Sequence, residues 1–245
     1  MARIMILRAS VLNVKPFQFN MNMSLIIEHL SNSLREAIMS AVPNHAQQDK
    51  KYMLKIPVQK RSKETVASIV ESCSRLLVQE PYHAITTDKI AAMAGVSIGS
   101  LYQFFANKEA IVAAVIDDLL QKDLTYIEEH LSKLHAPDLD AKVHAFIDIG
   151  FTRFQDNRPL RTALQGVQGM LDYWETRRVF FEHYQKAVLQ HLPVIPGRDR
   201  EMVALFIVSC FNNILNLSLL GPQGPEREQA IKNEVFLLMS RYIKP

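Results

Sequence analysis

Polar side chains suited to hydrogen bonding gather on one face of the segment between Ser97 and Gln103. Leu101 and Phe105 are four residues apart, so one face of a helix here can anchor to a core. The opposite face carries Ser97, Ile98, Ser100, Tyr102 and Gln103. Hydroxyl and amide groups hydrogen-bond to phosphates and base edges, and a glutamine can pair with adenine through two hydrogen bonds. These residue types in this pattern favour recognition of nucleic acid.

Two short helices joined by a tight turn are needed to position this face. Thr86 or Thr87 can cap the first helix, because a hydroxyl accepts a hydrogen bond from an unpaired N–H. Gly95 stands where a helix often ends in a left-handed residue, a conformation that glycine adopts without a Cβ clash. Ser97 offers a second N-cap. The segment is therefore predicted to be a helix-turn-helix, whose second helix enters the major groove.

The same segment resembles the DNA-binding part of tetracycline-repressor-like (TetR) regulators. The matching residues are Ile90-Ala91, Ala94-Gly95-Val96-Ser97, Gly99-Ser100-Leu101-Tyr102, Phe105 and Asn107-Lys108-Glu109. With the preceding helix, the resemblance covers roughly residues 60 to 110, and the rest of the chain shows only the family's general all-helical layout. It implies a sequence-specific transcriptional regulator, most often a repressor, that a small ligand releases from double-stranded operator DNA.

The helix face and the resemblance together define a set of expected DNA contacts. Ser97, Tyr102 and Lys108 are expected to bind phosphates, through hydroxyls and a helix start. Ser100 and Gln103 are expected to reach base edges, and the isoleucine on this face to touch a thymine methyl group. The predicted DNA-binding residues are Lys60, Arg61, Thr87, Ser97, Ile98, Ser100, Tyr102, Gln103 and Lys108.

A basic run precedes the first predicted helix, Ser62 to Gln79. Residues 50–63 contain five lysines, one arginine and no acidic residue. A solvated linker is one interpretation. The position immediately before a DNA-binding unit favours another, an arm on phosphates or in the minor groove, because flexible basic arms gain affinity by releasing counterions.

Composition and motifs argue against an enzyme. The chain has 245 residues, of which 48% are hydrophobic and 22% charged, as in ordinary soluble globular proteins. A net charge of +3 does not by itself indicate nucleic-acid binding. Cys73 and Cys210 lie far apart in apolar helical patterns, which suggests buried thiols in a reducing compartment. The sequence has no nucleophile motif, phosphate-binding glycine loop or metal-ligand spacing, so we expect a cytoplasmic protein without cofactor, metal or catalytic residues.

Helical periodicity predicts an all-α fold in three parts. Residues 1–55 are expected to be a weakly ordered N-terminal extension, although 25–42 has the spacing of an amphipathic helix. Residues 56–110 are expected to form a three-helix DNA-binding domain, and 111–245 a helical effector-binding and dimerisation domain. Beyond Asn107, helices are predicted to about residue 135 and over 138–155, 160–169, 171–192, 198–220 and 225–243.

Large aromatic side chains in the second domain suggest a ligand pocket. Pockets for small organic molecules are mostly apolar with a few polar groups, so a small apolar or aromatic effector is expected. Gly150, Gly166 and Gly169 would weaken helical rigidity, which suits an element that shifts. For any one aromatic residue, simple filling of a core is an equal alternative. The candidate pocket residues are Phe146, Phe154, Gln165, Gln168, Tyr173, Trp174, Phe181 and Tyr184.

The last two predicted helices suit a homodimer interface. The first is almost continuously apolar from Met202, but asparagines interrupt it and neither a basic cluster nor an aromatic belt flanks it. Burial therefore explains it better than a membrane span. Pairing with the same two helices of a second copy matches the four-helix interface that the resemblance implies. An architectural DNA-binding protein and a protein-interaction module, both without a small-molecule effector, remain as alternatives.

Overall fold

The computed structural model describes residues 52–167, 174–221 and 224–244, apart from the side chains of residues 174–177 and 179. The regular elements of this part are helices, as predicted for an all-α protein. Residues from 52 onward belong to one compact unit. The helix predicted over 25–42 lies outside the described residues.

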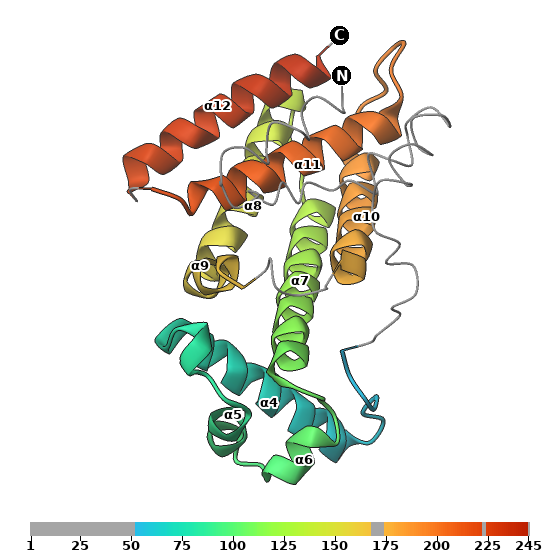
Figure 1. Ribbon diagram of the computed structural model, residues 1–245. Helices are drawn as coiled ribbons and strands as arrows, with labels where there is room; N and C mark the ends of the chain where they lie inside the picture. The colour runs from blue at the N-terminus through green and yellow to red at the C-terminus, as the bar shows by residue number, and fades with distance from the viewer. Residues whose placement is uncertain (1–51, 168–173, 222–223, 245) are drawn as a thin grey trace, which may run out of the picture. The chain divides into compact units, whose positions relative to one another are not determined.

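Three helices at one end form the predicted DNA-binding unit (Figure 1). They are α4 (Lys60–Gln79), α5 (Thr87–Ala94) and α6 (Ile98–Tyr102), with a single 3-10 turn, η1 (Tyr82–Ala84), after α4. The apolar stripe of α4 packs on α5, so that Ile69, Cys73 and Ile90 are completely buried. Burial raises the pKa of the unpaired Cys73 thiol to about 12, as expected for an inert core cysteine.

Local hydrogen bonds determine where α5 and α6 begin and end. The Thr86 hydroxyl accepts a hydrogen bond from the Lys89 N–H at 3.2 Å, and the Ser97 hydroxyl accepts one from the Ser100 N–H at 3.1 Å. Gly95 ends α5 in the left-handed region, with φ of 66°. The predicted caps and glycine turn are confirmed, and α6 itself is short.

A long helix, α7 (Lys108–Ser132), runs from the DNA-binding unit into the second half of the protein (Figure 1). The Asn107 side-chain oxygen caps it by accepting the Ala110 N–H at 2.8 Å. Its first turns pack on α4, and its later turns pack on α8 and α10. Because a continuous helix transmits displacement along its axis, α7 connects the two halves mechanically.

Five further helices complete the described chain. They are α8 (Leu139–Asp156), α9 (Arg158–Gln165), α10 (Trp174–His191), α11 (Arg200–Ser218) and α12 (Pro225–Ile243). α10 packs on α7 and α11, and α12 packs on α8. The short α9 packs on α4, so Leu164 and Val167 belong to the same hydrophobic core as the DNA-binding helices. That core therefore extends past residue 110, the predicted domain boundary.

Residues at the start of the described chain pack against this core. The Leu54 N–H donates to the Phe104 carbonyl at 2.8 Å, and Met53 forms an isolated β-bridge with Phe105. The Tyr52 hydroxyl donates to an Asp117 carboxylate oxygen at 2.6 Å. Burial and this hydrogen bond raise the pKa of Tyr52. The packed unit thus includes Tyr52 and Met53, which the predicted boundary assigned to the extension.

Gly150 allows a close approach between α8 and α11. A Cβ atom at this position would lie 2.3 Å from Cε1 of Phe211, a side chain with no exposed surface. A Cβ atom at Gly166 would meet nothing nearer than the Ala163 carbonyl oxygen, at 4.0 Å. The small size of Gly150 therefore serves packing, and its expected effect on helical rigidity stays a prediction. Gly169 lies outside the described residues.

We expect Gly150→Ala to lower the free energy of unfolding by about 1–3 kcal/mol, because the added methyl group overpacks the contact with Phe211. Gly166→Ala is the matched control. Gly166 has an ordinary right-handed backbone, with φ of −69°, and space for a methyl group. It should leave stability unchanged or raise it by about 0.4–1 kcal/mol. Urea denaturation of both variants measures the difference, and equal stabilities would contradict the packing role.

Candidate nucleic-acid interface

The short helix α6 has one buried face and one exposed face. Leu101 and Phe105 have no exposed surface, which confirms their predicted role as core anchors. Ile98 is 38% exposed and Tyr102 46% exposed, although both are large and apolar or aromatic. Gln103 is exposed at the C-terminal end of the helix. The predicted DNA-contact face of α6 is thus presented to solvent. We call this face, formed by Ser97, Ile98, Ser100, Tyr102 and Gln103, the reading face.

Hydroxyl pairs organise this face before any DNA is bound. The Tyr102 hydroxyl lies 2.9 Å from the Thr87 hydroxyl and thereby links α6 to α5. The Ser97 and Ser100 hydroxyls lie 2.8 Å apart. A hydroxyl in one such bond retains further capacity for a phosphate or base edge. Within the described part of the chain, the Gln103 carboxamide makes no hydrogen bond, so its donor and acceptor are both available.

Lys108 makes internal contacts that its sequence position does not reveal. Its ammonium group donates to the carbonyls of Tyr82 and Ile85, both at 2.9 Å, and lies 3.9 Å from the Tyr82 ring centre. The Tyr82 hydroxyl in turn donates to a Glu109 carboxylate oxygen at 2.7 Å, which lowers the pKa of Glu109. Lys108 therefore holds η1 against the start of α7. An ammonium group has three donors, so one remains for the predicted phosphate contact.

The basic residues before α6 lie partly on a helix. α4 begins at Lys60, so Lys60 and Arg61 occupy its first turn rather than an extended arm. Both are exposed, and the Lys60 side chain is 92% accessible. Lys55 follows directly after Leu54, whose N–H is bonded to Phe104 at the end of α6. Lys55 therefore lies close to the C-terminal end of α6.

The candidate pocket residues fall into different environments. Phe154, Phe181 and Tyr184 are buried to more than nine-tenths and fill the core. Gln165 donates a hydrogen bond to the Asn216 carbonyl at 3.1 Å. The side chains of Gln168, Tyr173 and Trp174 lie outside the described residues.

Phe146 borders a small apolar cavity. Its ring centre lies 5.1 Å from that of Phe211, and the cavity beside it measures about 50 Å³. Leu131, Val188 and Ile207 form other parts of the wall. An engineered apolar cavity that binds benzene measures about 150 Å³, three times as large. The aromatic residues of this region therefore act mainly as core in this arrangement.

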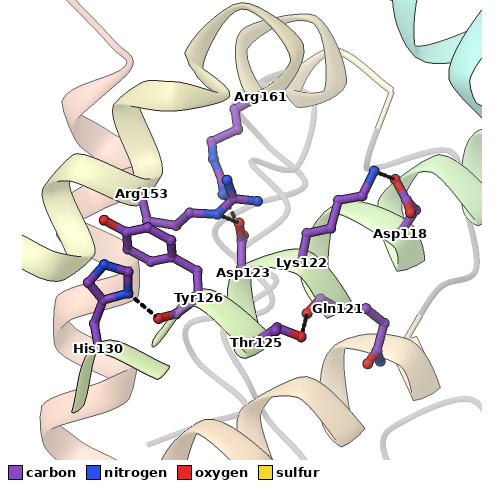
Figure 2. A network of polar contacts seen from close by, with 9 residues as sticks. All are labelled: Asp118, Gln121, Lys122, Asp123, Thr125, Tyr126, His130, Arg153 and Arg161. Carbon is purple, nitrogen blue, oxygen red and sulfur yellow. Dashed lines mark hydrogen bonds and ion pairs between the residues drawn. The ribbon is translucent and has the colours of Figure 1, made fainter. Parts of the chain in front are cut away.

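A buried ion cluster, absent from the sequence-based expectations, joins α7, α8 and α9 (Figure 2). Asp123 on α7 is only 4% exposed. One of its carboxylate oxygens accepts from Nε of Arg153 on α8 at 2.8 Å, and the other accepts from Nη2 of Arg161 on α9. The pKa of Asp123 is raised, because the effect of burial exceeds the opposite effect of the two guanidinium groups. The sequence did contain a signal, because Asp123 lies at four-residue spacing between Leu119 and Ile127 on an apolar stripe.

The cluster links the core of the second half to the DNA-binding unit. Arg161 also lies over Phe154, with its guanidinium carbon 4.5 Å from the ring centre. Because α9 packs on α4, the bond between Arg161 and Asp123 fixes α9 against both α7 and α4. The contact of α9 with α4 is thus the direct connection between this cluster and the DNA-binding unit.

Comparisons with known proteins agree with this arrangement. Residues 69–115 match the pattern of the family described as bacterial regulatory proteins, tetR family. The chain is 30% identical over 176 residues to the nucleoid occlusion factor SlmA of Haemophilus ducreyi, covering 67% of this chain and 86% of that protein. It is 26% identical over 168 residues to the HTH-type transcriptional regulator BetI of Vibrio campbellii, covering 66% and 84%. A crystal structure of a TetR-family transcriptional regulator from Streptomyces coelicolor, 23% identical, shares the fold with a TM-score of 0.55 over 75% of this chain and all of that one.

We expect Asp123→Ala to lower the free energy of unfolding by about 3–5 kcal/mol, because it leaves two mostly buried guanidinium groups without their carboxylate. The matched control is Asp118→Ala on the same helix. Asp118 pairs with Lys122 at 2.7 Å, but their side chains are 46% and 65% exposed (Figure 2). Its loss should cost no more than about 1 kcal/mol. Chemical denaturation of both variants tests the difference, and similar losses would rule out a special role for the buried cluster.

Proposed function

The chain belongs to the tetR family of bacterial regulatory proteins and is a DNA-binding transcriptional regulator, and we propose that it acts as a homodimeric repressor released by a small effector. The observation that supports DNA binding is the exposed polar face of α6, which the buried residues Leu101 and Phe105 hold in place. Its place of action would be the cytoplasm, where the chromosome lies.

The reading face divides into base contacts and phosphate contacts. The carboxamide of Gln103, which has no hydrogen-bond partner among the described residues, suits an adenine edge, and the exposed Ile98 suits a thymine methyl group. Ser97 and Tyr102 present hydroxyls to the backbone, and Lys108 presents its remaining donor. The exposed cations Lys55, Lys60 and Arg61 add sequence-independent attraction, which weakens as salt concentration rises.

Exposed apolar residues on the last two helices support the dimer. The proposed apolar face consists of residues that are each between 44% and 58% exposed: Phe206 and Leu217 on α11, Leu237 and Leu238 on α12, and Leu220 just after α11. Of the described helices, α11 is the one whose length and composition would also fit a membrane span. Its opposite side is buried against the rest of the chain, as at Val208 and Leu215. A second copy related by a two-fold axis can cover the apolar face and set two reading helices on a palindromic site.

Release by an effector requires coupling between the two halves. A ligand weakens DNA binding only if it prefers the arrangement that does not bind DNA, by about 1–3 kcal/mol for ordinary coupling. Both α7 and α9 contact α4, so either can transmit the change.

A second candidate is a DNA-binding protein without a small-molecule effector. Two observations favour it, the likeness to a protein named as a nucleoid occlusion factor and the small volume of the apolar cavity beside Phe146. Release of operator DNA by a small molecule separates this candidate from the first.

Selection of bound sequences from random duplex DNA should yield a roughly palindromic site. Gln103→Ala should relax the preference at one position in each half-site, at a cost of about 1–3 kcal/mol there. Gln79→Ala, at an exposed glutamine near the end of α4, should leave the selected site unchanged. If Gln103→Ala selects the same site with the same strength as the parent, the assigned base contact is wrong.

Leu217→Asp should convert the dimer into a folded monomer at micromolar concentration. Leu217 is 58% exposed in the single chain, so a charge there spoils the proposed interface without entering the core. Leu215, only 6% exposed, would instead unfold on the same change. Val78→Asp, on an exposed valine of α4, is the control and should stay dimeric. Sedimentation with circular dichroism measures both properties, and a monomeric parent would refute the dimer.

A further inference from the structure

A polar pocket of about 330 Å³ lies where α8, α9, α11 and α12 meet. Phe151 and Ile231 contribute apolar walls, and Gln155, Arg158 and Glu228 contribute polar ones. The volume falls at the lower end of the range for small-molecule sites, about 300–1,000 Å³. It is also distinct from the apolar cavity beside Phe146, with which it shares no lining residue.

Arg158 brings an unneutralised positive charge to this pocket. Its Nη1 donates to the Gln155 side-chain oxygen at 2.9 Å, but its buried Nη2 has no acceptor among the described residues. No described carboxylate forms an ion pair with it. Leaving a buried donor unsatisfied costs free energy, and the cost is higher for a charged group. Other atoms of Arg158 line the pocket, so the buried Nη2 gains an acceptor when the side chain turns toward an acceptor held there.

The neighbouring groups reinforce the positive character of the site. Asn157, one residue earlier, also has a buried amide nitrogen without an acceptor among the described residues. It precedes α9 without making a side-chain cap.

The carboxylate in the pocket lining does not neutralise Arg158. Glu228 accepts from the Gln155 side-chain nitrogen at 2.9 Å and pairs with Lys232, also at 2.9 Å. Arg227 also lines the pocket, and its guanidinium group donates to the Leu220 carbonyl at 2.9 Å. The balance of charge around the pocket therefore favours an anion.

We propose that this pocket binds a small organic anion, with a carboxylate against Arg158 and an apolar body against Phe151 and Ile231. We assign this anion as the effector, a step that rests on the proposed function of the protein as a ligand-responsive regulator. The assignment adds an acidic group to the small apolar or aromatic effector that the sequence led us to expect.

The position of Arg158 supplies a route to the DNA-binding unit. Arg161 lies one turn further along α9, and its guanidinium group is bound to Asp123 on α7. An anion that draws Arg158 and the start of α9 into the pocket also strains this ion pair. Because α9 packs on α4, the displacement reaches the DNA-binding unit formed by α4, α5 and α6.

Titration calorimetry on the full chain tests the binding site, with benzoate and hexanoate as probes and benzamide and hexanamide as their neutral counterparts. Either carboxylate should bind saturably with a Kd below the order of 10 mM, and the amides should bind far more weakly. Arg158→Gln should weaken carboxylate binding at least about tenfold, because it removes a charge-assisted hydrogen bond. Arg158→Lys keeps the charge and should retain part of the affinity.

Arg241→Gln is the matched control, since it makes the same charge change at an exposed position near the other end of α12. It should bind carboxylate like the parent. Failure of both carboxylates to bind, or equal binding by the parent and Arg158→Gln, overturns the site. Circular dichroism confirms that each variant is folded.

Operator-binding assays then test the effector role. Benzoate or hexanoate at saturation should weaken operator binding by the parent at least about fivefold and leave Arg158→Gln unaffected. Carboxylate binding through Arg158 with unchanged operator affinity would overturn the effector assignment. A parent that binds no operator would instead refute the proposed function, while calorimetry, which uses no DNA, would still decide the pocket.

Discussion

The buried carboxylate of Asp123 is the contact on which the arrangement of the second half depends. It holds Arg153 of α8 and Arg161 of α9 against α7, at a place where all three side chains are largely shielded from water. Burying an ion pair is expensive, and the attraction repays that cost only when the geometry is good. Such a cluster is therefore better understood as a device for fixing the positions of three helices than as a source of net stability.

The reading face of α6 depends on side chains that hydrogen-bond within the protein and on others that stay available for DNA. Lys108 holds η1 against the start of α7, and the paired hydroxyls of Thr87 and Tyr102 hold α5 against α6. The Gln103 carboxamide is left without an internal partner in the described chain. Groups that position the helix are thus paired inside the protein, whereas the group best suited to read a base is not. This arrangement lowers the ordering cost that the protein meets when it binds.

The second half contains two candidate ligand regions with opposite properties. The apolar region around Phe146 is almost filled, and Gly150 shows how closely α8 and α11 approach beside it. The polar pocket at Arg158 is larger and contains a buried donor without an acceptor among the described residues. Since α9 lies between this pocket and α4, occupancy there has a shorter mechanical route to the DNA-binding unit.

The sequence by itself determined the all-α class, the helix-turn-helix and most helix boundaries. These features arise from interactions within three or four residues, such as the caps at Thr86, Ser97 and Asn107 and the left-handed turn at Gly95. Periodicity likewise identified Leu101 and Phe105 as core and placed Gln103 on the exposed face. Only the tertiary structure decided that Asp123 joins two arginines, that Gly150 meets Phe211 and that Lys108 binds two carbonyls. It also decided that Arg158 has no carboxylate partner among the described residues. Each of these outcomes depends on contacts between residues that are distant in sequence and on how deeply those residues are buried. Local sequence spacing determines neither the contacts nor the burial.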